Sequence, residues 1–153
     1  MKITDMRVWL TRVPVTGLSP RTWVFIEIDT DAGITGIGEA SCSGGGGSIV
    51  VGNILNYLRN GSDLGDFRES ILGENPEDIE RIWHKLFRRF TGGGGWGGFV
   101  TTVVSGIDIA LWDIKGKALG RPIYDLLGGR FRDRILLYTH VKTPDPQQAA
   151  IHA

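Results

Sequence analysis

The sequence predicts an α+β fold in which an antiparallel three-stranded meander is followed by a helical bundle. Three segments with alternating apolar and polar residues come first, and segments with helical apolar spacing follow, without the strict alternation of a parallel sheet. Near the C-terminus, Arg134 to Val141 again favours a strand, and a helix starts at about Pro144. A strand followed by a helix is how a (β/α) barrel begins. We therefore expect two domains, residues 1–129 and the first strand and helix of a truncated barrel in residues 130–153.

The three N-terminal strands follow from the spacing of their apolar side chains, because alternate residues of a strand face the same side. Pro14, Gly17 and Pro20 indicate a loop after the first strand, and Asp31-Ala32-Gly33 a tight turn after the second. The predicted strands are Lys2 to Thr11, Thr22 to Thr30 and Ile34 to Ala40.

The helices are predicted from apolar stripes and from the residues that begin and end them. In the third of them, Asn75 is the expected N-cap and Pro76 the first helical residue. The fourth and longest is the most apolar, with a stripe at Ile107, Leu111, Ile114 and Ala118, and Gly120 and Pro122 end it. Five helices are predicted: one that starts after Ser48, and four more at Phe67 to Leu72, Asn75 to Phe90, Ser105 to Gly120 and Ile123 to Leu127.

Composition excludes several classes of function. The 17 basic and 17 acidic residues give a formal net charge of zero, which argues against a nucleic-acid partner. Arg88-Arg89, at the end of a predicted helix, are better explained by the helix dipole. No apolar run approaches the roughly 18 residues of a membrane span, so no membrane partner is expected. Cys42 is the one cysteine and no signal peptide is evident, which indicates a cytoplasmic protein.

Two glycine-rich segments, 44–47 and 92–98, resemble nucleotide-binding loops only superficially. Gly92, Gly94 and Gly97 match G-x-G-x-x-G, but a helix rather than a strand precedes them and no G-K-[ST] follows. Glycine runs are costly to order, which favours either lids that close over a ligand or plain flexible connectors.

The string A-L-W-D-I-K-G-K-A-L-G-x-P-x-Y-x-L-L-G-G at 110–129 resembles the segment that joins the capping domain to the barrel in the enolase superfamily, in the mandelate racemase and muconate lactonizing enzyme branch. The opening strand, the run at 30–40 and the helix at 76–90 resemble that branch in the same order. This resemblance implies an enolase-like N-terminal capping domain. It also implies a Mg²⁺ cofactor whose ligands, like the catalytic acids and bases, lie on later barrel strands, so no catalytic residue and no metal ligand is expected in this chain.

The reaction implied by the resemblance is removal of the proton α to a carboxylate. Small polar residues in the loops, such as Ser41, Ser43 and Thr16, favour a sugar acid as substrate, with loss of water to a 2-keto-3-deoxy acid. Racemisation, epimerisation or cycloisomerisation is the alternative. A homo-oligomer is implied in the same way.

Four residues are candidates for substrate binding. Ser43 lies where the resemblance places a small polar side chain facing a substrate hydroxyl, although its hydroxyl could instead bond its own loop. His140 lies near the end of the predicted barrel strand, where barrel active sites form, although a structural histidine is nearly as well supported. Arg21 could pair with a carboxylate or be solvated. Trp96 could stack on a ligand or anchor its loop.

Other acidic residues are expected to be structural. Asp108 and Asp113 should hold the long helix to its neighbours, and Asp113 and Lys117 have the spacing of an ordinary helical ion pair. From a different class of function, the chain could be a free-standing, non-catalytic α+β binding module. The strand-like sequence after Gly129 argues against this, because one strand and one helix cannot bury the strand's two faces. We therefore expect an N-terminal piece of a longer enzyme.

Overall fold

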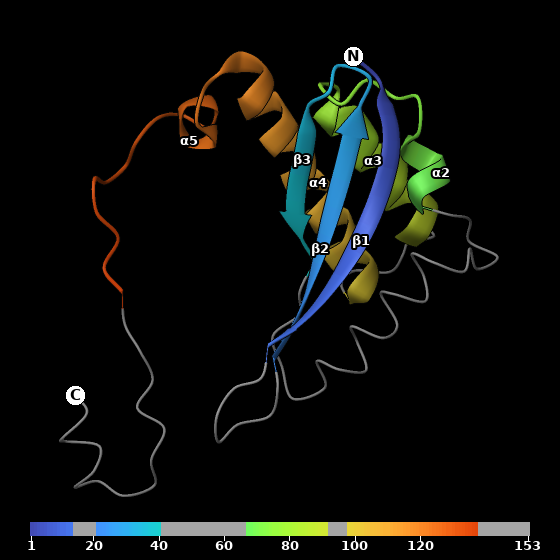
Figure 1. The fold of residues 1–153 in the computed structure, drawn as a ribbon, viewed down its shortest axis with the longest axis horizontal. Helices are drawn as coiled ribbons and strands as arrows, with labels where there is room; N and C mark the ends of the chain where they lie inside the picture. The colour runs from blue at the N-terminus through green and yellow to red at the C-terminus, as the bar shows by residue number, and fades with distance from the viewer. Residues whose placement is uncertain (14–20, 41–66, 92–97, 138–153) are drawn as a thin grey trace, which may run out of the picture.

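The computed structural model describes residues 1–13, 21–40, 67–91 and 98–137, and its first part is the predicted meander (Figure 1). The strands are β1 (Ile3–Val13), β2 (Arg21–Thr30) and β3 (Thr35–Glu39), all antiparallel in the order β1-β2-β3. Their bounds differ from the predicted ones by no more than two residues. Gly33, with φ 73°, occupies the tight turn between β2 and β3 that the sequence predicts.

One face of the sheet forms the core, and the helices cover it (Figure 1). Val24, Ile26 and Ile28 of β2 are fully buried, whereas Phe25 and Glu27 between them face the other side and are only half-buried. The alternation seen in the sequence thus separates a core face from an outer face.

Four helices are described: α2 (Phe67–Ile71), α3 (Ile79–Thr91), α4 (Phe99–Leu119) and α5 (Ile123–Leu126). The predicted start of α3 is wrong by three residues. Asn75 accepts bonds from the backbone N–H of Glu77 (through Oδ1, 3.2 Å) and of Asp78 (through its carbonyl, 3.1 Å), which makes a separate turn. The first helical bond then runs from Ile82 N–H to the Asp78 carbonyl (3.0 Å), and the helix begins at Ile79. The predicted apolar stripe of α3 is confirmed, with its members buried or half-buried.

Helix α4 packs directly on β3, backbone against backbone. A Cβ placed on Gly38 would overlap the carbonyl oxygen of Gly106, and one on Gly36 would overlap that of Ala110. On the helix side, a Cβ on Gly106 would lie 2.8 Å from Cβ of Ala40. We call the contact of residues 36–40 with 106–110 the glycine seam. Glycine is required in it because any side chain would force the helix away from the sheet.

The C-terminal part of α4 extends past the sheet. Ala118, predicted to continue the buried stripe, is exposed because it lies one turn beyond Ile114, which already packs on Gly36 near the start of β3. Gly120, with φ 62°, ends the helix as predicted: its N–H bonds the Lys117 carbonyl (3.2 Å), and Arg121 N–H bonds the Gly116 carbonyl (2.9 Å).

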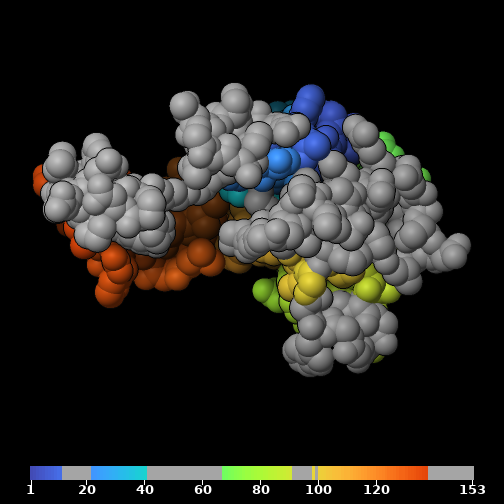
Figure 2. Space-filling model, turned by 90° about the horizontal axis from the view of Figure 1, so that it is seen from below, coloured from blue at the N-terminus to red at the C-terminus, as the bar shows by residue number. Residues whose placement is uncertain are grey.

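The segment after α5 is exposed and lies to one side of the sheet and helices (Figure 2). The predicted strand from Arg134 is not found in residues 134–137, and its continuation, 138–141, lies outside the described residues. A strand needs a neighbour to bond, and within the described ranges none pairs with this segment. Its apolar side chains are almost fully solvated, with Leu136 92% and Leu137 85% exposed.

Candidate functional site

Four residues that bound three segments, Val13, Arg21, Ala40 and Gly98, lie toward one end of the domain, which we call the loop end (Figure 1). These segments are 14–20, 41–66 and 92–97, and two of them hold the glycine-rich runs. Val13 and Arg21, which bound the first segment, pair directly across β1 and β2. Ala40, which precedes the second, bonds through its N–H to the Val24 carbonyl of β2 (2.8 Å), close to the same end.

The helices hold the remaining boundaries, those of α2, α3 and α4. Phe67, the first residue after 41–66, stacks on Phe90 near the end of α3, with ring centroids 3.8 Å apart. Gly106 faces Gly38 and Ala40, whereas Ala110 faces Gly36, so α4 runs antiparallel to β3 and its first residue also lies toward the loop end. The sheet and α4 therefore hold the boundaries of both glycine-rich segments near one another.

Of the four predicted site residues, Ser43, Trp96 and His140 lie outside the described residues. Arg21 is placed by its backbone, as the first residue of β2 opposite Val13 at the loop end, but its side chain is not described. The structure thus brings together the strands and helix that bound the segments of Ser43, Arg21 and Trp96. His84 is exposed on α3, edge-on to Trp83 at 5.3 Å between ring centroids, as expected for a surface histidine.

The start of α4 is an electropositive feature of the loop end that the sequence analysis did not single out. Gly98 precedes the helix without a side-chain cap, and no acidic residue lies in the first turn. Thr101 Oγ1 is buried and has no hydrogen-bond partner among the described residues. An uncapped helix start carries partial positive charge and free N–H groups, which favour anionic groups nearby. The signal in the sequence was the run of glycines, without Ser, Thr, Asp or Asn, in front of an apolar helix.

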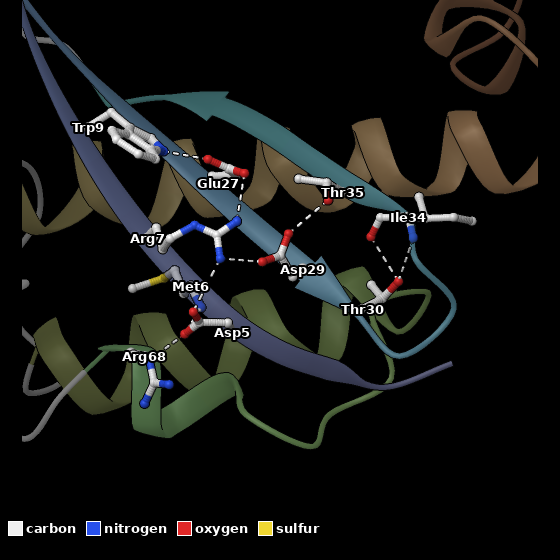
Figure 3. Close-up of polar contacts among 10 residues, drawn as sticks. All are labelled: Asp5, Met6, Arg7, Trp9, Glu27, Asp29, Thr30, Ile34, Thr35 and Arg68. Atoms are coloured by element: carbon white, nitrogen blue, oxygen red, sulfur yellow. Dashed lines mark hydrogen bonds and ion pairs between the residues drawn. The ribbon is translucent and has the colours of Figure 1, made fainter.

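The outer face of the sheet carries a cluster of ion pairs (Figure 3). Arg7 of β1 bonds Glu27 (Nη2 to Oε1, 2.7 Å) and Asp29 of β2, and contacts Asp5 (Nη1 to Oδ2, 3.3 Å). Arg68 of α2 donates from Nε to Asp5 Oδ1 (2.8 Å), and the indole of Trp9 donates to Glu27. These five charged residues and Trp9 form the Arg7 cluster.

The Arg7 cluster has the electrostatics of a structural network. The hydrogen bond from Arg68 holds the pKa of Asp5 below its usual value, although partial burial opposes this. Hydrogen bonds to Glu27 and then Asp29 raise the pKa of Arg7. A carboxylate stabilised in its charged form is a poor proton acceptor, so this cluster suits cross-strand support rather than acid-base catalysis.

Asp108 and Asp113 of α4 were both predicted to hold the helix to its neighbours, and the structure shows such a contact for Asp113. Asp113 Oδ2 accepts from the Ile37 N–H of β3 (2.9 Å) and from Lys117 Nζ (2.7 Å), which confirms that it holds the helix to the sheet. Asp108 is half-buried beside α3, and burial first, then the charge of Glu80, raises its pKa. Within the described ranges, no three His, Cys, Asp or Glu side chains are grouped so that they could hold a metal ion.

None of the described helices combines the length and apolarity needed to cross a bilayer. Comparison with known proteins finds enzymes among the relatives of this chain. The model of the "Mandelate racemase / muconate lactonizing enzyme, N-terminal domain" family matches residues 3–128. A D-galactonate dehydratase of Variovorax paradoxus is 38% identical over 133 residues, covering 86% of this chain and 31% of the relative. A D-xylonate dehydratase of Haloferax volcanii is 36% identical over 152 residues, covering 97% of this chain and 32% of the relative.

Solved structures give the same result. The 3,6-anhydro-D-galactonate cycloisomerase of Zobellia galactanivorans superposes with a TM-score of 0.66 at 27% identity, covering 84% of this chain and 32% of that one. A mandelate racemase/muconate lactonizing enzyme of Sulfitobacter sp. gives 0.61 at 32% identity, covering 87% and 31%. The chain spans about a third of the length of the curated relatives it matches.

Proposed function

The chain belongs to the mandelate racemase/muconate lactonizing enzyme family of the enolase superfamily, and on this premise we propose that it is the substrate-capping part of a magnesium-dependent sugar-acid dehydratase. The observation that carries the proposal is its likeness to D-galactonate and D-xylonate dehydratases, at 38% and 36% identity over most of this chain. The complete enzyme would take the proton α to the substrate carboxylate and expel the β-hydroxyl as water, which leaves a 2-keto-3-deoxy acid.

The loop end is the part of this chain that would meet the substrate. The residues that bound its three segments lie on paired strands and packed helices, which fixes where these segments begin and end. The uncapped start of α4 adds a favourable field for an anionic substrate. We propose Ser43 and Trp96, which belong to these segments, and Arg21, which bounds the first of them, as substrate-contacting residues, with His140 as a fourth from the predicted strand that follows.

Magnesium would stabilise the charge that develops on the substrate carboxylate. The described residues do not fit a magnesium site, because they contain no suitable group of acidic side chains. We therefore place the ligands, the catalytic acid and the catalytic base outside the described residues, on the barrel that the relatives' length implies, and we derive no step through the metal. The proposal includes a homo-oligomeric enzyme.

The direct test is a substrate screen on the protein purified from its native source, with its intact mass measured first. We expect a mass well above 16.8 kDa and formation of a 2-keto-3-deoxy acid from a sugar acid such as D-galactonate or D-xylonate, lost when magnesium is chelated. A product with the same mass as the substrate, from which no water has been lost, would favour the alternative, a racemase, epimerase or cycloisomerase. The likeness to a cycloisomerase structure supports that alternative. No turnover of any carboxylate tested would contradict the proposal.

A variant pair tests the capping role in the active protein. Ser43→Ala should lower kcat/KM about tenfold, the effect of losing one hydrogen bond to substrate, with thermal stability unchanged. Ser105→Ala is the matched control, since it removes the same hydroxyl group from an exposed position on α4, and it should change neither quantity. Equal kinetics for the two variants would remove Ser43 from the site.

A further inference from the structure

The free edge of β3 carries backbone groups that a further strand would bond. Ala40 N–H bonds the Val24 carbonyl of β2 (2.8 Å), so the N–H and C=O groups of the alternate residues Thr35, Ile37 and Glu39 point away from β2. The strand order β1-β2-β3 places β3 at the edge of the sheet, with no further strand beside it among the described residues.

Two side chains of α4 occupy part of this edge. The Asp113 carboxylate accepts the outward N–H of Ile37 (2.9 Å), and the Lys117 ammonium donates to the outward carbonyl of Thr35 (2.7 Å). The two side chains also pair with each other, Nζ to Oδ2, at 2.7 Å. Asp113 and Lys117, one helical turn apart, thus bond the N–H of Ile37 and the carbonyl of Thr35, two backbone groups that an added strand would otherwise bond.

The strand itself protects its edge only by its short length and by the charge of the exposed Glu39. Unpaired edges invite addition of another strand, and proteins commonly prevent this with proline, lysine or an inward-pointing charge on the edge strand. The sequence of β3, Thr-Gly-Ile-Gly-Glu, has no proline or lysine, and its inward positions are the two glycines of the seam. The side chain of Ile37 is 50% exposed.

We propose that Asp113 and Lys117 protect the open edge of the sheet, and that without them β3 pairs antiparallel with β3 of a second copy of this chain. A second copy is the fitting partner because the N–H and C=O of Ile37 both point outward. When two copies are related by a two-fold axis, the Ile37 N–H of each copy can bond the Ile37 carbonyl of the other, so the strand is complementary to itself. The protection is independent of the proposed enzymatic activity.

The test is the double variant Asp113→Ala with Lys117→Ala in the full chain. Sedimentation velocity over a range of concentrations should show a dimer that the parent does not form. The Ile37 amide should exchange with solvent at least tenfold faster than in the parent at low concentration, and slow again as the dimer forms. Arg130→Ala with Asp133→Ala is the matched control, because it removes an exposed ion pair of equal net charge that touches no strand. It should sediment as the parent does.

A further substitution identifies the surface used. Ile37→Pro in the double variant removes the outward N–H but no bond to β2, so it should abolish the new association. Should the double variant be too unstable to study, Asp113→Asn with Lys117→Ala keeps an acceptor for Ile37 and exposes only the Thr35 carbonyl, and it should associate more weakly. The proposal is overturned if the double variant sediments like the parent at every concentration, or, where that variant cannot be studied, if Asp113→Asn with Lys117→Ala does so. Association that survives Ile37→Pro would also overturn it.

Discussion

The two faces of the sheet are stabilised in different ways, although the same strands form both. The core face meets α4 through the glycine seam, where the backbone of the helix touches the backbone of β3 at Gly36 and Gly38. The outer face is held by the Arg7 cluster, whose charged members keep about a fifth to two fifths of their side-chain surface in water. Close packing admits no extra atom, whereas solvated charges can rearrange and are screened by salt. Substitutions should therefore cost most at the seam.

The largest expected effect is that of Gly38→Ala. The new methyl group would overlap the Gly106 carbonyl, and the helix must move for it to fit, at a cost of about 3 kcal/mol in the free energy of unfolding. Urea unfolding followed by circular dichroism measures this.

Gly33→Ala is the control for Gly38→Ala, since Gly33 has open space around it but a φ of 73°, and should cost about 1–2 kcal/mol from the backbone alone. A Gly38→Ala variant no less stable than Gly33→Ala would show that the seam is not closely packed.

Asp5→Asn tests the outer face and should destabilise less than Gly38→Ala. Because the hydrogen bond from Arg68 lowers the pKa of Asp5 in the folded protein, the charged carboxylate contributes stability above its unfolded pKa. That contribution is lost as the pH falls through the lowered folded pKa. The difference between parent and variant should thus be present at neutral pH, shrink as the pH falls below the unfolded pKa, and decrease in high salt. A difference that does not change with pH would assign the effect to packing.

Asp108→Asn should change the free energy of unfolding least among these variants, and should raise it rather than lower it. Burial and the neighbouring Glu80 raise the pKa of Asp108, so the ionised side chain opposes folding at neutral pH, and this cost disappears as the pH falls below the unfolded pKa. The variant should be more stable than the parent by about 0.5 kcal/mol at neutral pH and equal to it in acid. Thermal unfolding at several pH values would detect this, and a destabilised variant at neutral pH would show that the carboxylate makes a needed contact.

Alternation and apolar spacing were enough to predict the meander, the stripe of α3 and the end of α4 at Gly120, because each depends on neighbours in sequence. The start of α3 was not predictable from its capping pattern, since Asn75 is equally suited to the separate turn that it forms. The exposure of Ala118 depends on where the sheet ends, which the sequence of the helix does not contain.

The sequence predicted individual residues of the candidate site, whereas the structure adds the arrangement of the strands and helices next to them. Alternation could place Arg21 just before a strand, but only the pairing of strands and the direction of α4 bring Val13, Ala40 and Gly98 toward the same end as Arg21. The Arg7 cluster had a signal in the sequence, because Asp5 and Arg7, like Glu27 and Asp29, are two residues apart on strands. Their ion pairing required the register of β1 with β2.

The glycine seam also makes α4 a lever. At about 1.5 Å per residue, its start at Phe99 lies roughly 10 Å from a pivot at Gly106, and its end at Leu119 lies roughly 20 Å away on the other side. A tilt of about 10° at the seam would displace the distal end by some 3–4 Å and the end beside the glycine-rich segment by about half as much, in the opposite direction. Such a tilt would move the loop end and the connection toward α5 together, and the bonds of Asp113 and Lys117 to β3 oppose it.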